Sequence, residues 1–220
     1  GVSGLFAQQR DTIAIIDAGS SGSRLYVSCI ENKNTLKKIY PQETEKSSSE
    51  GRALSDVAVD EGSVKAYVND MTSKYKVSNK VPLYILATAG MRKVAKEDAE
   101  SIYSYMKEGE TYNNYEIESA MTISGRYEGL YAWIAANYQY KSLGFNTSTT
   151  EKPLTYTGQP YGIIEIGGAS MQIAYPASSD LKDGNLISRK GFSNIYCKSY
   201  LGGGAKAIFK NPKHIYQIKK

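Results

Sequence analysis

TIAIIDAGSSGSRLYVS, at residues 12–28, has a counterpart in YGIIEIGGASMQIAY, at residues 161–175. Each stretch contains an apolar run that leads into a carboxylate, a glycine-containing turn and a second apolar run. Apolar and β-branched residues on both sides of such a turn are typical of a β-hairpin. Strands are therefore predicted at residues 12–17, 24–30, 161–166 and 171–175. The strand-turn-strand unit occurs twice, which indicates an internal structural repeat.

Strands and helices alternate along the rest of the chain. An outer strand is predicted near residues 36–40, where Lys37 and Lys38 suit a sheet edge. Apolar residues at helical spacing predict helices over 60–75, 96–107 and 125–141, and a short helix within 202–209. Further strands are predicted at 83–87, 115–123, 186–189 and 195–201. This alternation indicates an α/β fold, and the polar stretch 147–159 predicts a boundary between a first lobe, 1–158, and a second lobe, 159–220.

Composition excludes several classes of protein. Hydrophobic residues make up 41 % of the 220 residues and charged residues 22 %, which favours a folded core over disorder. The net charge of +5 is scattered along the chain, so an anionic small molecule is expected in preference to nucleic acid. No run reaches the roughly 18 apolar residues of a membrane span. We expect a soluble chain, or a mature chain whose signal peptide has been removed.

Histidine and cysteine are both scarce. The single histidine, His214, lies in a lysine-rich tail, which argues against a zinc enzyme or a Ser/His/Asp hydrolase. Cys29 and Cys197 lie in apolar strand-like runs, which favours two separate buried thiols, although a disulfide between them stays open. The glycosylation triplet Asn146-Thr147-Ser148 carries little weight, since such triplets arise often by chance.

The two glycine turns predict a site for phosphates. Glycine lets the backbone turn sharply and bring N–H groups and hydroxyls onto an anion. The first turn follows Asp17, and the second follows Glu165. Two such loops facing each other across a cleft would clamp a polyphosphate, with Mg²⁺ or Ca²⁺ held between the carboxylates.

Four segments, in order, resemble the conserved regions of the nucleoside triphosphate diphosphohydrolases, the apyrase family. They are DAGSSGSR at 17–24, ATAGMR at 87–92, GRYEGLYAWIAANY at 125–138 and IIEIGGASMQIAY at 163–175. A fifth stretch, YCKSYLGGGA at 196–205, resembles the segment that follows in that family. The resemblance covers about residues 13 to 205 with the spacing intact.

The resemblance implies an actin-like (ribonuclease-H-like) two-lobe fold with mixed sheets and a nucleotide cleft between the lobes. It also implies divalent-cation-dependent removal of the terminal phosphate of nucleoside tri- and diphosphates, without a covalent intermediate. Glu128 matches the general base, Ser170 and Gln172 match residues that hold the attacking water, and Asp17 and Glu165 match carboxylates that hold the metal through water. The phosphate-binding positions are Gly19, Ser20, Ser21, Gly22, Ser23, Arg24, Thr88, Ala89, Gly90, Arg92, Gly167, Gly168 and Ala169. Trp133, the only tryptophan, is expected to anchor lobe packing.

The chain departs from the family pattern in two ways. Glu165 stands where the family usually has Asp, and the extra methylene moves the carboxylate outward by about 1.5 Å. A hydrated metal shell absorbs such a change more easily than direct ligation does. The second lobe is also short, so a further segment or second chain is expected to complete it, and this chain alone should be poorly active. By analogy with apyrases, the protein is expected outside the cytosol.

Other functions remain as alternatives. An exopolyphosphatase-like phosphohydrolase would share the architecture, but its local motifs differ from GGASMQ and ATAGMR. A non-catalytic nucleotide-binding relative would keep the loops and lose the base, whereas Glu128, Ser170 and Gln172 are all present. The absence of G-x-x-x-x-G-K-[ST] excludes a P-loop enzyme. Base preference, the ratio of triphosphate to diphosphate hydrolysis and the oligomeric state are left open.

Overall fold

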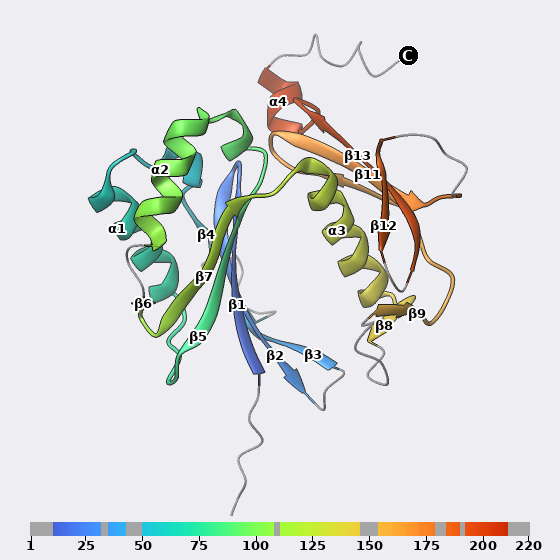
Figure 1. The fold of residues 1–220 in the computed structure, drawn as a ribbon, viewed down its shortest axis with the longest axis horizontal. Coiled ribbons are helices and arrows are strands. Elements are labelled where there is room, and N and C mark those ends of the chain that lie inside the picture. Colours follow the sequence, from blue (N-terminus) through green and yellow to red (C-terminus); the bar gives the residue numbers. More distant parts are fainter. Residues whose placement is uncertain are drawn as a thin grey trace, which may run out of the picture.

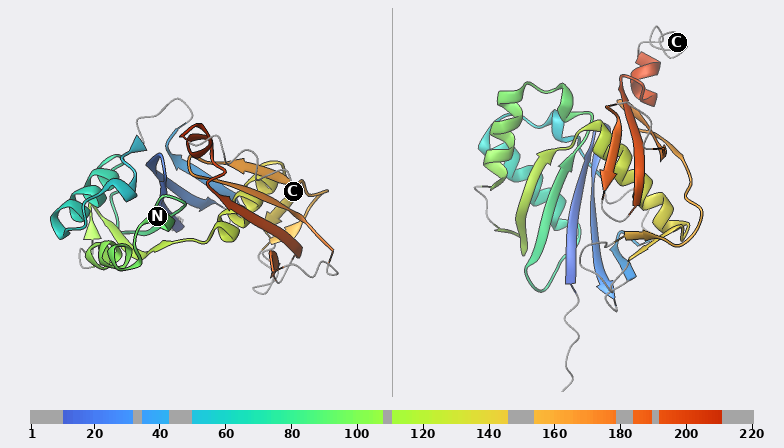
Figure 2. Two further views of the ribbon diagram at one scale, coloured as in Figure 1. Left: turned by 90° about the horizontal axis from the view of Figure 1, so that it is seen from above. Right: turned by 45° about the vertical axis from the view of Figure 1, so that its right-hand side comes forward.

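A computed structural model describes residues 11–31, 35–42, 50–107, 111–145, 154–178, 184–189 and 192–210. His214 and the triplet at 146–148 lie outside these described residues. The two main sheets lie side by side, and helix α3 runs between them (Figure 1). A separate view of the same arrangement shows α4 at the end of the second sheet (Figure 2).

The first sheet is seven-stranded and mixed, with the order β3-β2-β1-β5-β7-β6 and β4 paired to β2. Its strands are β1 (Asp11–Gly19), β2 (Gly22–Glu31), β3 (Thr35–Tyr40), β4 (Glu50–Gly51), β5 (Val81–Ala87), β6 (Thr111–Tyr112) and β7 (Tyr115–Thr122). The β1–β2 and β2–β3 pairs are antiparallel, whereas β1–β5 and β5–β7 are parallel. Because β1 and β5 are parallel, their carboxyl ends lie at the same end of the sheet, and the first glycine turn follows β1 there.

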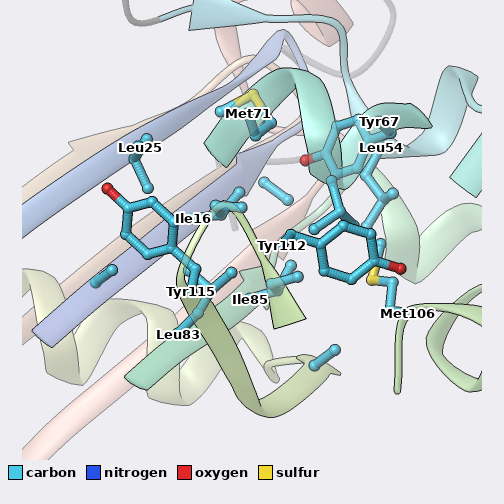
Figure 3. Packing of buried hydrophobic residues seen from close by; sticks show 14 of the residues in the cluster. Ile16, Leu25, Leu54, Tyr67, Met71, Leu83, Ile85, Met106, Tyr112 and Tyr115 are labelled. Carbon is cyan, nitrogen blue, oxygen red and sulfur yellow. The ribbon is translucent and has the colours of Figure 1, made fainter. Parts of the chain in front are cut away.

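Two helices, α1 (Glu61–Ser73) and α2 (Lys96–Lys107), cover one face of this sheet (Figure 1). Asp60 caps α1, because its side chain accepts a hydrogen bond of 2.8 Å from the Ser63 amide. Figure 3 shows side chains from α1 and the sheet, such as Tyr67, Ile16 and Ile85, packed in one buried cluster. This core supports the ends of the strands that carry the site.

The second sheet is antiparallel, with the order β10-β11-β13-β12. Its strands are β10 (Ile163–Ile166), β11 (Ser170–Pro176), β12 (Leu186–Arg189) and β13 (Phe192–Leu201). Helix α3 (Gly125–Gln139) packs against it, and α4 (Ala205–Lys210) follows β13. A two-stranded ribbon, β8 (Leu143–Phe145) and β9 (Leu154–Tyr156), adjoins α3.

The packing of α3 argues for a different lobe boundary. Leu130 and Trp133 of α3 belong to the same buried cluster as Ala174 and Cys197 of the second sheet. The indole of Trp133 is fully buried and donates a 2.7 Å hydrogen bond to the carbonyl of Tyr161, so its predicted packing role is confirmed. The predicted boundary at residue 158 divides this cluster. We propose instead that the first lobe ends near residue 123, where β7 gives way to α3.

The internal repeat is confirmed at the level of strand register. Asp17 on β1 lies opposite Arg24 on β2, and Glu165 on β10 lies opposite Gln172 on β11. Both pairs enclose a hairpin of the same length. Each lobe therefore presents a carboxylate beside a tight turn, in the same relation to its sheet.

Both cysteines are free and buried, which confirms the prediction of separate thiols. Burial raises the pKa of the Cys197 thiol to about 11, so this thiol stays protonated and unreactive at neutral pH. Within the described residues, no helix combines the length and apolar character needed to cross a membrane.

Candidate active site

The two hairpin turns meet at one cavity of about 130 Å³ between the lobes. The cavity is lined by Asp17, Gly19, Ser20, Ser21, Gly22, Arg24, Thr88, Ala89, Glu128, Glu165, Gly167, Gly168, Ala169 and Ser170. The turns touch directly, because a Cβ atom placed on Gly168 would overlap the Ser21 hydroxyl and lie 2.9 Å from the Ser20 hydroxyl. Glycine at 168 thus permits this close approach, since a larger residue would displace the two serine hydroxyls.

Three carboxylates line this cavity: Asp17 from β1, Glu128 from α3 and Glu165 from β10. Burial raises the pKa of all three side chains above their ordinary values. The charges of Glu128 and Asp17 raise the pKa of Glu165 further, whereas Arg24 opposes the shift at Asp17. Such mutual repulsion in one cavity is relieved by a cation.

Glu128 is held at the start of α3 by partners from both lobes. Ser124 caps the helix, and Glu128 lies in its first turn. Its Oε2 atom accepts hydrogen bonds from Arg92 Nη2 at 2.8 Å and from Gln172 Nε2 at 3.0 Å. No donor from the described residues contacts Oε1. The carboxylate is therefore oriented through one oxygen, which leaves the other for chemistry.

Arg92 joins the lobes behind this carboxylate. Besides Glu128, its guanidinium donates to the hydroxyl of Ser170 at 3.1 Å and to the carbonyl of Ile123 at 3.1 Å. The ion pair is well shielded, since the side chains of Arg92 and Glu128 are 16 % and 15 % exposed. Burial is nevertheless the larger influence on Glu128, whose pKa is raised although Arg92 lowers it. Arg92 does not line the cavity, so the geometry favours orientation of Glu128 over direct phosphate contact.

Gln172 also lies behind the cavity and is fully buried. Its Nε2 atom lies 2.8 Å from Ser170 Oγ and 3.0 Å from Ser199 Oγ. The amide thus links Glu128 and Ser170, which do line the cavity. Gln172 is placed to orient these two groups through Nε2, while its Oε1 is buried and has no hydrogen-bond partner among the described residues.

Ser199 was missed by the sequence analysis. It lies on β13 directly opposite Gln172, so that Glu165, Gln172 and Ser199 form one row across three strands. A Cβ atom on Gly125 would overlap the Ser199 hydroxyl, which shows how closely α3 approaches the sheet here. Strand alternation places 197 and 199 on the helix-facing side, but only the pairing register brings Ser199 to Gln172.

Ser23, one of the predicted phosphate-binding residues, does not line the cavity. Its side chain is fully buried on the opposite face of β2, where its hydroxyl donates to the Arg52 carbonyl at 2.9 Å and accepts from Tyr67 at 2.7 Å. Alternation along β2 explains this placement: Arg24 faces the cavity, so Ser23 must face the core. Gly90 also lies outside this cavity and lines a neighbouring one.

One of the cavity carboxylates has the environment expected of a group near a divalent cation. Glu165 Oε2 is buried and accepts no hydrogen bond from the described residues, which is the condition expected of a group that faces a cation or its water shell. Within the described ranges, no three His, Cys, Asp or Glu side chains come close enough to ligate one ion directly. The arrangement therefore fits a hydrated Mg²⁺ or Ca²⁺ held through water.

Two matching hairpins present carboxylates and hydroxyls to one interlobe cavity, which defines an α/β protein with a site divided between two lobes. The profile of the GDA1/CD39 (nucleoside phosphatase) family matches residues 6–219, and the chain belongs to this family. The predicted family is thereby confirmed.

Individual relatives agree with this assignment. The nucleoside-diphosphatase mig-23 of Caenorhabditis briggsae is 31 % identical over 87 % of this chain and 37 % of its own length. Ectonucleoside triphosphate diphosphohydrolase 1 of Bos taurus is 29 % identical, over 85 % of this chain and 40 % of its own length. The chain thus spans less than half the length of these relatives.

The fold is shared with a solved structure of nucleoside triphosphate hydrolases from Neospora caninum. The two superpose with a TM-score of 0.63 at 17 % identity, over 89 % of this chain and 45 % of that chain. The predicted actin-like α/β fold class is confirmed.

Proposed function

We propose that the whole protein hydrolyses the terminal phosphate of nucleoside tri- and diphosphates, with Glu128 as the general base. The observation that carries the proposal is the placement of Glu128 in the cavity between both hairpins, with Oε2 held by Arg92 and Gln172. In-line attack on a phosphoryl group needs an oriented water and a base within hydrogen-bond reach. Oε1 of Glu128 accepts the proton from that water, and Ser170 helps to orient the water.

The substrate phosphates are held by the turns. Ser20, Ser21, Gly168 and Ala169 line the cavity beside the contact between the hairpins, so they would surround a terminal phosphoryl group bound there. Thr88 and Arg24 add a hydroxyl and a positive charge at the cavity wall. Burial raises the pKa of the Glu128 carboxylate above its ordinary value, which makes it a better proton acceptor.

Asp17 and Glu165 would hold Mg²⁺ or Ca²⁺ through water. When bound, the cation neutralises charge on the phosphates and on the crowded carboxylates. Because the cation would relieve repulsion among these carboxylates, it should also stabilise the folded protein when no nucleotide is hydrolysed.

Divalent cation is expected to raise the melting temperature of the protein in the absence of nucleotide. The stabilisation should reach about 2.7 kcal/mol at one hundred times the dissociation constant. Glu165→Gln should lose much of this response, because it removes one of the three charges, whereas Glu165→Asp should keep it and keep or raise activity. Thermal melts with Mg²⁺, Ca²⁺ and EDTA check this. An equal cation response in Glu165→Gln and the parent would contradict the assignment of Glu165.

We further propose that a strand from another segment or chain completes the second sheet along β10. In the first sheet, β1 pairs with β2 on one side and in parallel with β5 on the other. Its counterpart β10 pairs only with β11 among the described residues. Ile164 and Ile166 on β10 are 68 % and 59 % exposed, which leaves apolar surface beside the open edge.

The ectonucleotidases and plant apyrases among the relatives support a location outside the cytosol.

Phosphate release from a panel of substrates tests the function. The whole protein should hydrolyse nucleoside triphosphates and diphosphates with Mg²⁺ or Ca²⁺, and should lose activity in EDTA. If a further strand pairs with β10 as proposed, residues 1–220 alone should be poorly active, because the edge of β10 would lack that strand. Full activity in EDTA would refute the metal proposal. Turnover of long polyphosphate with none of the nucleotides would favour the exopolyphosphatase alternative, and nucleotide binding without turnover would favour a non-catalytic relative.

A further inference from the structure

A second cavity, of about 360 Å³, adjoins the one that contains the carboxylates. Ser20, Gly168 and Ala169 line both cavities, so the two spaces meet at the contact between the hairpin turns. The second cavity is built from both lobes. The first lobe contributes Ser55, Asp56, Gly90, Lys93 and Val94, and residues of α4 come from the second.

The two cavities differ in charge. Three lysines line the second cavity: Lys93 from the first lobe and Lys206 and Lys210 from α4. Asp56 is the one carboxylate among its lining residues, which leaves an excess of positive charge. In the described part of the chain, no carboxylate lies within ion-pair distance of any of the three lysines. Their charges are therefore available to an anion.

The cleft thus has an acidic cavity at one end and a basic cavity at the other, which suggests how a phosphate chain would be oriented in it. A phosphate chain whose end lies among Asp17, Glu128 and Glu165 would reach the lysine-lined side along Ser20, Gly168 and Ala169, which line both cavities, and the touching turns would have to separate to admit it. The lysines would then face the phosphates of the leaving group, whose negative charge increases as the terminal bond breaks. A cationic pocket at this place stabilises a longer phosphate chain more than a shorter one.

We propose that the cavity lined by Lys93, Lys206 and Lys210 binds the third phosphate from the end of the chain, so that the protein prefers triphosphates to diphosphates. The inference rests on the proposed function of the neighbouring site. The chemistry is shared by two ligand sources, a nucleoside triphosphate and inorganic triphosphate. A diphosphate would present a sugar or solvent to the lysines.

The test measures binding and turnover in the whole protein. Calorimetry in the non-hydrolysing Glu128→Gln background uses ATP, ADP, inorganic triphosphate and pyrophosphate, each with Mg²⁺. The variant Lys93→Ala/Lys206→Ala/Lys210→Ala is compared with Lys80→Ala, a lysine before β5 at the far end of the sheet that pairs loosely with Glu116 at 3.8 Å. The triple variant should weaken both triphosphates about tenfold, as expected when about three exposed ion pairs are lost. ADP and pyrophosphate should change by less than about twofold to threefold, and Lys80→Ala should change none of the four.

Each outcome is decisive. Equal weakening of triphosphates and diphosphates would overturn the proposal, because the lysines would then act only as general positive charge. Weakening of ATP alone would assign the cavity to the nucleoside and would also overturn it. Unchanged binding would leave the lysines without a ligand. Binding is measured without turnover, so a protein that binds triphosphate through these lysines but hydrolyses nothing would refute the proposed function and not this inference.

Asp56→Asn should have the opposite effect to the lysine substitutions. Removing the single carboxylate of the cavity should tighten inorganic triphosphate by about twofold to threefold and leave pyrophosphate unchanged. In the catalytically active background, the triple lysine variant should lower the ratio of kcat/KM for ATP to that for ADP by about tenfold. A parallel loss for both nucleotides would contradict a site for the third phosphate.

Discussion

Replacing Glu128 by glutamine is expected to lower kcat by about 10²–10⁴-fold, the range typical for the loss of a general base. Glutamine keeps the shape of the side chain and its reach to Arg92 and Gln172, but it cannot accept a proton at Oε1. Nucleotide binding should change little, because the turns and not Glu128 hold the phosphates. Steady-state turnover, together with calorimetric binding of nucleotide, measures both quantities.

Glu118→Gln is the matched control for this variant. Glu118 is an exposed residue of β7, and its side chain lies outside both interlobe cavities. The control should have the parent kcat and the parent melting temperature. A Glu128→Gln enzyme with parent turnover would mean that Glu128 is an ordinary helix residue, and the proposed mechanism would lose its base.

Arg92→Met should have the second largest effect, with kcat lowered by about 10²–10³-fold and stability lowered by about 3 kcal/mol. The variant leaves the shielded carboxylate of Glu128 without its cationic partner. It also removes the guanidinium that donates hydrogen bonds to both Glu128 and Ser170. Denaturant unfolding measures the stability loss, and Arg92→Lys should recover part of it by restoring the charge.

The dependence of kcat on pH shows whether Arg92 acts on the carboxylate of Glu128 or only on packing. Arg92 lowers the pKa of Glu128, so its removal raises that pKa and less of the carboxylate is ionised at a given acidic pH. The acid limb of the profile should therefore move to higher pH in Arg92→Met and less so in Arg92→Lys. If kcat fell in Arg92→Met with no shift of the acid limb, Arg92 would act on packing alone.

Several features followed from local sequence with little error. The predicted helix at residues 96–107 and strand at 186–189 have these bounds in the structure, and Asp60 caps α1. Apolar spacing and capping residues act within a few turns of one element, so they are visible in the sequence. The equal lengths of the two hairpins are also local, which is why the repeat identified Asp17 and Glu165 as counterparts.

Other features depended on which elements meet. Helix α3 follows the first sheet in the chain but packs on the second, because its buried Leu130 and Trp133 fit the face that carries Ala174 and Cys197. The polar stretch after α3 predicted a boundary at residue 158, whereas this packing supports our proposal of a boundary near residue 123. Ser23 was assigned to phosphate binding from its position in a motif, although strand alternation turns it into the core.

The sequence by itself determined the α/β fold class, the repeated hairpins, the family and the candidate base Glu128, because each depends on spacing within a short segment or on a recognisable motif. Only the tertiary structure decided that Arg92 and Gln172 hold the same oxygen of Glu128, that Ser199 lies behind them, and that three lysines from two lobes share one cavity. The hydrogen bonds that link Arg92, Glu128, Gln172 and Ser199 join residues that are 27 or more positions apart in the sequence. The physical reason is that strand register and the packing of α3 between the sheets set such distances, and neither is encoded in the local pattern of any single segment.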